Sequence, residues 1–189
     1  MSPSARFRVA AFYQFKTLAE PALLRDRIAA ATDELRGTVL VAEEGVNGTI
    51  SGGEAAVQVF IDHLRALGFD RLELKFSWSA TSPFHRMKVK LKAEIVTLGM
   101  GDLDPEHNAG EYVAPEAWNA LLADPEVLVV DTRNTYETSL GSFAGAVIPG
   151  TEAFRDFPAW VEENLDPARH RRVAMFCTGG IRCEKSTAL

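Results

Sequence analysis

The residues of this chain best suited to covalent chemistry are its only two cysteines, Cys177 and Cys183. They begin and end one short string, Cys177-Thr178-Gly179-Gly180-Ile181-Arg182-Cys183. An apolar run ends at Cys177 and predicts a strand, and reactive groups in open α/β sheets lie at the carboxyl ends of strands. The two glycines let backbone N–H groups turn toward the sulfur, and Arg182 adds positive charge or ties the loop down. A helix expected after Cys183 would further favour the thiolate, so the spacing predicts an activated cysteine at 177.

Each cysteine also has a plainer interpretation. A cysteine at the end of a strand is more often a small buried hydrophobic residue than a nucleophile. The glycine loop, the arginine five residues on and the α/β context together favour the nucleophile for Cys177. For Cys183 two interpretations stay open. It is either a resolving thiol or a replacement for the small hydroxyl residue expected at a helix start.

Composition limits the remaining function classes. The two cysteines and the four histidines show no metal-ligand spacing, so we identify neither a metal nor a cofactor site. So few cysteines favour a reducing, cytoplasmic location, and the chain has no signal-peptide pattern and no apolar run long enough for a membrane span. The formal net charge is −6, so an RNA site would have to be a local basic patch.

One such patch is predicted on a strand in the middle of the chain. Apolar and basic residues alternate there, and the basic members are Arg86, Lys88, Lys90 and Lys92. This stripe is either an RNA phosphate-contacting surface or a solvated edge that guards a sheet against aggregation. Lys75 lies on an earlier strand and is expected near it.

The first half of the chain follows a β-α-β-β-α-β order, which predicts a ferredoxin-like α+β domain over residues 1–98. The expected elements are strands at 6–15, 37–42, 46–51, 72–78 and 87–98, and helices at 20–35 and about 57–67.

The second half alternates strands with helices, which predicts an α/β domain with a parallel sheet over residues 112–189. A polar, glycine-containing segment at 99–111 is predicted to be a linker. The expected strands are Val127–Asp131, Phe143–Ile148 and Arg172–Phe176. Asp131 and Arg133 are expected to support the floor of the site by ion pairing, together with Glu137.

The second half resembles the rhodanese family. The residues that carry the resemblance are Asp131-Thr132-Arg133, Tyr136-Glu137, Gly145-Ala146-Val147-Ile148-Pro149-Gly150 and the cysteine loop. In that family the first loop cysteine, here Cys177, forms a persulfide. Related phosphatases have the longer spacing C-x5-R, whereas this chain has C-x4-R from Cys177 to Arg182, which is typical of the sulfur-handling form.

Over nearly its whole length the chain also resembles the TrhO family, the rhodanese-domain proteins of tRNA uridine 5-hydroxylation. The matching segments are 43–52, 86–90, 94–96, 110–112 and 177–185. The resemblance implies oxygen-dependent formation of 5-hydroxyuridine at the tRNA wobble position, with molecular oxygen as cosubstrate and Cys177 as the catalytic residue. A rhodanese fold normally continues beyond such a loop, so we expect the domain at 112–189 to be incomplete.

Three functions are therefore considered. The first is a tRNA uridine hydroxylase whose N-terminal domain helps hold tRNA. The second is a rhodanese-type sulfurtransferase that carries a persulfide on Cys177. The third is a non-catalytic RNA-binding or interaction protein. Loss of effect on replacing Cys177 would favour the two enzymes, and dependence on oxygen rather than thiosulfate would favour the first.

Overall fold

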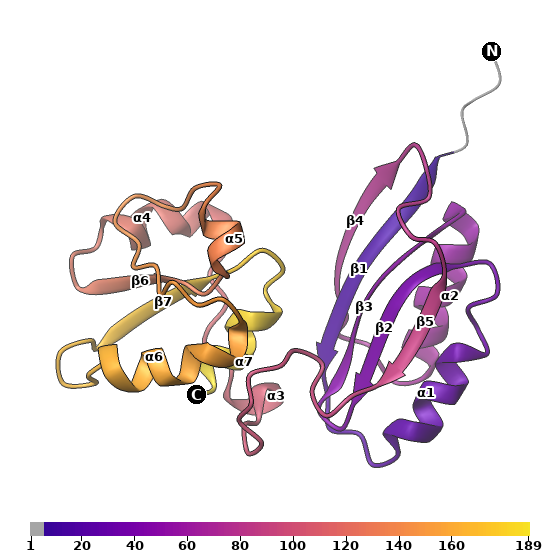
Figure 1. Cartoon of the computed structure of the whole chain (residues 1–189), viewed down its shortest axis with the longest axis horizontal. Helices are drawn as coiled ribbons and strands as arrows, with labels where there is room; N and C mark the ends of the chain where they lie inside the picture. Colours follow the sequence, from indigo (N-terminus) through magenta and orange to yellow (C-terminus); the bar gives the residue numbers. More distant parts are fainter. Residues whose placement is uncertain (1–5) are drawn as a thin grey trace. The chain divides into compact units, whose positions relative to one another are not determined.

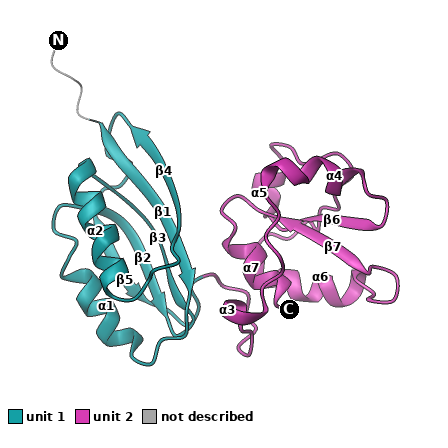
Figure 2. Ribbon diagram, turned by 180° about the vertical axis from the view of Figure 1, so that it is seen from behind, with its two compact units in different colours: residues 1–95 teal, residues 96–189 magenta. Residues whose placement is uncertain are grey.

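A computed structural model describes residues 6–189, and the chain divides into two compact units, residues 1–95 and 96–189 (Figure 2). The first unit contains a five-stranded sheet and the second a pair of parallel strands. The predicted first domain, residues 1–98, ends three residues later than the boundary between the units.

The sheet of the first unit has the strand order β4-β1-β3-β2-β5. Its strands are β1 (Phe7–Phe15), β2 (Arg36–Ala42), β3 (Gly45–Gly52), β4 (Glu73–Ser79) and β5 (Met87–Leu91). The pairs β1–β3, β1–β4 and β2–β3 are antiparallel, whereas β5 adds to the edge of β2 in parallel. The predicted β-α-β-β-α-β order is therefore confirmed, with β5 as one further strand at the edge.

Two helices, α1 (Pro21–Ala29) and α2 (Glu54–Ala66), cover one face of this sheet (Figure 1). The core lies between the sheet and the two helices, because alternate strand residues point toward the helices. Its fully buried members include Phe12, Val39, Ile50, Phe60 and Leu64. The predicted helix at 20–35 was too long. The hydroxyl of Thr32 donates to the carbonyl oxygen of Ala29, a local bond that competes with helix continuation.

Strand β5 is shorter than the 87–98 prediction because the chain turns back over the sheet. The backbone N–H of Ile95 donates to Glu44 Oε1 at 2.7 Å, and Asn47 Nδ2 donates to the Ile95 carbonyl at 2.9 Å. Ile95 is 1% exposed. These bonds reach across roughly fifty residues of sequence, so the alternating pattern could not reveal them.

The second unit is built on two parallel strands, β6 (Val127–Asp131) and β7 (Arg172–Phe176). Its helices are α3 (Pro105–Asn108), α4 (Trp118–Ala123), α5 (Thr135–Thr138), α6 (Phe157–Asn164) and α7 (Ile181–Thr187), with 3₁₀ turns η1 (Pro115–Ala117) and η2 (Phe154–Asp156). The predicted strand Phe143–Ile148 was wrong. That segment makes one parallel bridge, between Val130 and Val147, and the turn at Gly145 has a φ of +81°.

The predicted linker at 99–111 lies inside the second unit and contains α3. Just before it, Leu98 is 1% exposed and packs in the second core with Val130 and Phe157. At its far end the N–H of Gly110 donates to Thr187 Oγ1 at 2.8 Å. The segment is therefore attached to α7, the helix that follows the cysteine loop.

Gly37 gives a direct test of the packing within the first sheet. Its φ is +143°, and a Cβ there would lie 2.1 Å from the Thr49 carbonyl oxygen. We expect Gly37→Ala to lower the free energy of unfolding by about 3 kcal/mol, because the strained backbone and the clash add. Gly53→Ala is the matched control, since a Cβ there meets open space, and its effect should stay within about 0.5 kcal/mol. Equal denaturant midpoints for the two variants would contradict this account.

Candidate active site

Cys177 follows directly after β7, at the carboxyl end of the parallel strand pair. The end of β6 lies beside it. The N–H of Thr132 donates to the carbonyl oxygen of Phe176 at 3.1 Å, and so does the Thr132 hydroxyl. The apolar run that ends at Cys177 predicts this position at the end of a strand, because parallel strands end at one edge of a sheet.

The sulfur of Cys177 is surrounded by hydrogen-bond donors from its own loop. The N–H of Gly180 donates to Cys177 Sγ at 3.0 Å, and Gly180 adopts a φ of +93° that a glycine accepts at little cost. The thiol and the backbone N–H of Cys183 also hydrogen-bond this sulfur. Ile181 begins α7, and Cys183 lies in its first turn.

These donors stabilise the thiolate form of Cys177. The hydrogen bond from the Cys183 thiol is the largest cause, and the N–H donors and the Arg182 charge add to it. Burial acts in the opposite direction, but the pKa of Cys177 is still lowered to about 5. The same contact and burial raise the pKa of Cys183. One sulfur is therefore a thiolate near neutral pH, and the other keeps its proton.

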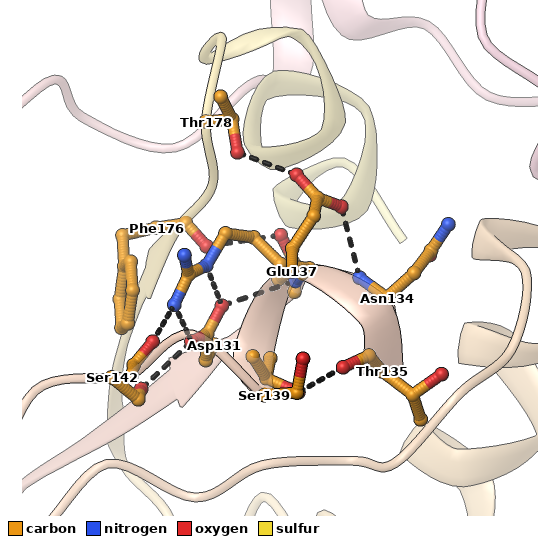
Figure 3. Close-up of polar contacts among 12 residues, drawn as sticks. Asp131, Asn134, Thr135, Glu137, Ser139, Ser142, Phe176 and Thr178 are labelled. Carbon is orange, nitrogen blue, oxygen red and sulfur yellow. Dashed lines mark hydrogen bonds and ion pairs between the residues drawn. The ribbon is translucent and has the colours of Figure 1, made fainter.

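Glu137 clamps the cysteine loop from α5. Its carboxylate accepts two hydrogen bonds from Arg182, both at 2.7 Å, and one from the Thr178 hydroxyl at 2.5 Å. Arg182 lowers the pKa of Glu137 to about 2, so the carboxylate stays charged. Figure 3 shows Glu137 turned toward Thr178 on one side and toward Asn134 on the other. Arg182 thus ties the loop down through Glu137. The residue pattern did not predict this contact between Glu137 and the loop.

Asp131 and Arg133 form a second ion pair beside the site. Arg133 donates to both oxygens of Asp131, at 2.8 and 2.7 Å, and the Ser142 hydroxyl donates to Asp131 at 2.7 Å (Figure 3). Burial opposes ionisation of Asp131, which is 0% exposed, but these hydrogen bonds lower its pKa. Arg133 also donates to the Gly141 carbonyl at 2.7 Å. The pair therefore fixes the turn after β6, a supporting arrangement of the kind that the sequence analysis predicted.

The basic stripe lies partly on β5. Met87 and Val89 pack against the first core, so Lys88 and Lys90 point to the face opposite the helices. The strand register places Lys88 at one end of a row that crosses all five strands. From β5 to β4 this row is Lys88, Thr38, Thr49, Ala11 and Lys75. Arg86 and Lys92 flank β5 and are exposed.

We call this sheet surface the open face. Its charged strand residues are Arg36, Lys75, Lys88 and Lys90 against the single acid Glu73. The two halves of the chain also differ in charge. Residues 1–95 carry 13 Lys and Arg against 11 Asp and Glu, whereas residues 96–189 carry 7 against 15. The basic excess lies in the first unit, although the whole chain is acidic.

Among residues 6–189, no group of three or more His, Cys, Asp and Glu side chains is arranged to hold a metal ion. Across the same residues, none of the helices has both the length and the apolar character needed to cross a membrane.

Comparison with known proteins identifies relatives of both units. Residues 7–95 match the family model described as the UPF0176 acylphosphatase-like domain. The proteins named tRNA uridine(34) hydroxylase from Mesorhizobium japonicum and Deinococcus radiodurans are 54% and 55% identical to the chain over 99% and 97% of its length. The chain spans 62% and 61% of these two relatives, about three fifths of their length. The match to a solved acylphosphatase from Bacillus subtilis covers 44% of this chain and 98% of the acylphosphatase chain, with 18% identity and a TM-score of 0.36.

The ionisation of Cys177 can be measured by alkylation. We expect the rate of iodoacetamide labelling to rise with pH around a midpoint of about 5, because the thiolate is the reacting form. Replacing Cys183 by alanine should move this midpoint upward, since the Cys183 thiol is the strongest donor to the sulfur. Cys177→Ser should remove the labelling that has its midpoint at about 5, which identifies the reacting residue. A midpoint in the ordinary thiol range of about 8.5 would contradict the site as described.

Proposed function

We propose that the chain belongs with the tRNA uridine(34) hydroxylases that it matches at 52 to 55% identity, and that the protein hydroxylates carbon 5 of uridine 34 in tRNA. Molecular oxygen is the proposed cosubstrate, and Cys177 is the proposed catalytic residue. The relatives named tRNA uridine(34) hydroxylase support the reaction, and the loop of hydrogen-bond donors that lowers the pKa of Cys177 is the observation that supports this residue as its catalyst. Strongly shifted pKa values of this kind concentrate at functional sites.

The other loop residues have different roles around Cys177. Gly180 and Cys183 donate to the sulfur, whereas Thr178 and Arg182 bind Glu137 and hold the loop in shape. Gly179 leaves room at the loop, since a Cβ there would meet nothing within 4 Å. Ile181 begins the helix that carries Arg182 and Cys183. Asp131 and Arg133 support the neighbouring turn without a chemical role.

The open face is proposed to hold the RNA. Its lysines and arginines can neutralise backbone phosphates, and the hydroxyls of Thr38 and Thr49 between them can donate to phosphate oxygens. Arg86, Lys88, Lys90 and Lys92 extend this surface along the β5 edge. The second unit carries a large excess of acidic residues, so it is poorly suited to supply the electrostatic part of the binding. A cytoplasmic location is proposed with this substrate.

A sulfurtransferase remains the second candidate, because one observation favours it as well. The donors around Cys177 would stabilise the terminal sulfur anion of a persulfide by the same hydrogen bonds. The C-x4-R spacing from Cys177 to Arg182 is also that of sulfur-handling loops. Dependence of product formation on thiosulfate and not on oxygen would select this candidate.

The function is tested in a strain that lacks the gene. Complementation with the natural gene should restore 5-hydroxyuridine at position 34, measured by mass spectrometry of purified tRNA. Complementation with the Cys177→Ser gene should leave this nucleoside at the background of the deletion strain, because serine has no thiolate. Equal amounts with both genes would contradict a catalytic Cys177, and no difference between deletion and wild-type strains would contradict the hydroxylase.

The open face is tested by RNA binding at several salt concentrations. The double variant Lys88→Ala/Lys90→Ala should weaken binding of a tRNA transcript at low salt and reduce the slope of log affinity against log salt by about 2, one for each lost phosphate contact. The control is Arg25→Ala/Arg65→Ala, which removes the same charge from helices α1 and α2. If both double variants lose the same affinity and slope, the basic residues of the open face have no special role.

A further inference from the structure

The contact between the two cysteines is the observation from which a further role follows. Cys183 hydrogen-bonds Cys177 through both its thiol and its backbone N–H. Its own sulfur also lies 3.6 Å from the Thr132 hydroxyl, a buried group that is held in turn by the Phe176 carbonyl. Cys183 is therefore held by Thr132, directly after β6, and by its place in α7, with its sulfur against Cys177. A serine at this position could donate the same hydrogen bond, but only a cysteine places a second oxidisable sulfur against Cys177.

Hydroxylation by molecular oxygen also has an electron requirement. Conversion of a C–H bond to C–OH supplies two of the four electrons that reduce O₂ completely, so two more must come from a donor. A pair of thiols that closes to one disulfide releases two electrons and two protons. Cys177 and Cys183 are both free thiols in this structure, and each is half-buried.

We propose that Cys183 is a second catalytic residue, the resolving thiol that supplies these electrons together with Cys177. This inference rests on the proposed hydroxylation. One oxygen atom of O₂ goes to carbon 5 of uridine, and the other goes to the Cys177 sulfur, which becomes a sulfenic acid. The Cys183 sulfur then attacks the Cys177 sulfur, the S–O bond breaks, and a disulfide and one water form. An external dithiol returns both residues to the thiol state for the next turnover.

The protonation states of the two cysteines fit these reaction steps. Cys177 is the thiolate, the form that reacts with electrophilic oxygen, and Cys183 keeps a proton that points at it. This proton can complete the water that leaves in the second step. Because the two sulfurs are already in hydrogen-bond contact, the attacking and the attacked atoms begin next to each other.

The test is a single turnover by the fully reduced protein after small thiols have been removed. A tRNA transcript with unmodified uridine 34 is added without oxygen, and ¹⁸O₂ is then admitted. We expect one labelled oxygen atom in each 5-hydroxyuridine and about one Cys177–Cys183 disulfide for each product, measured by differential alkylation and mass spectrometry. Without RNA, little disulfide should form in the same time. With added dithiothreitol, turnover should continue.

Cys183→Ser is the informative variant, because its hydroxyl can still donate to Cys177 while it cannot form a disulfide. This variant should make at most one product per molecule with dithiothreitol absent and should leave Cys177 as a sulfenic acid that dimedone traps. Product from the wild-type protein with both thiols still reduced would overturn the inference and leave the proposed function intact. Equal disulfide with and without RNA, or unlabelled oxygen in the product, would also overturn it. No product under any reductant would overturn the proposed function and this inference together.

Discussion

The second unit is organised around the hydrogen bonds that converge on the sulfur of Cys177. Burial by itself would keep this thiol protonated, so a thiolate exists only while the N–H of Gly180 and the donors of Cys183 point at it. These donors come from a glycine turn and from the first turn of α7, two segments that are too short to be stable alone. The sulfur chemistry therefore depends on whatever holds the loop and α7 in place.

Two carboxylates, one on the last residue of β6 and one on α5, provide much of that support. Glu137 binds Thr178 and Arg182, so one side chain fixes both ends of the loop. Asp131 binds Arg133 and keeps the intervening turn in one conformation. Both carboxyl groups have lowered pKa values because their partners are cations and hydrogen-bond donors. The supports therefore remain charged wherever the Cys177 thiolate itself exists.

The base of α7 is also fixed, by a buried lysine. Lys185 is 0% exposed, and its Nζ donates to the Val96 carbonyl at 3.0 Å. The Thr187 hydroxyl, two residues further on, accepts a hydrogen bond from the N–H of Gly110. Residues 96–110 therefore belong to the support of the cysteine loop.

The first unit has a different physical character, with a net basic sheet face suited to phosphate contact in place of a reactive group.

The sequence by itself determined the elements whose pattern is local. The alternation of apolar residues gave the order of the first unit, and the buried runs gave β6, β7 and the place of Cys177 at the end of β7. Local patterns failed wherever distant groups compete for the backbone, as at Ile95, which binds Glu44 and Asn47 and ends β5 early. The predicted linker failed for the same reason, since Gly110 binds Thr187, whereas the strand at 143–148 failed because the chain turns at Gly145. Only the tertiary structure could show that Glu137 clamps the loop and that the Cys183 thiol meets Cys177, because a hydrogen bond depends on distance and direction in space, which residue order alone does not fix.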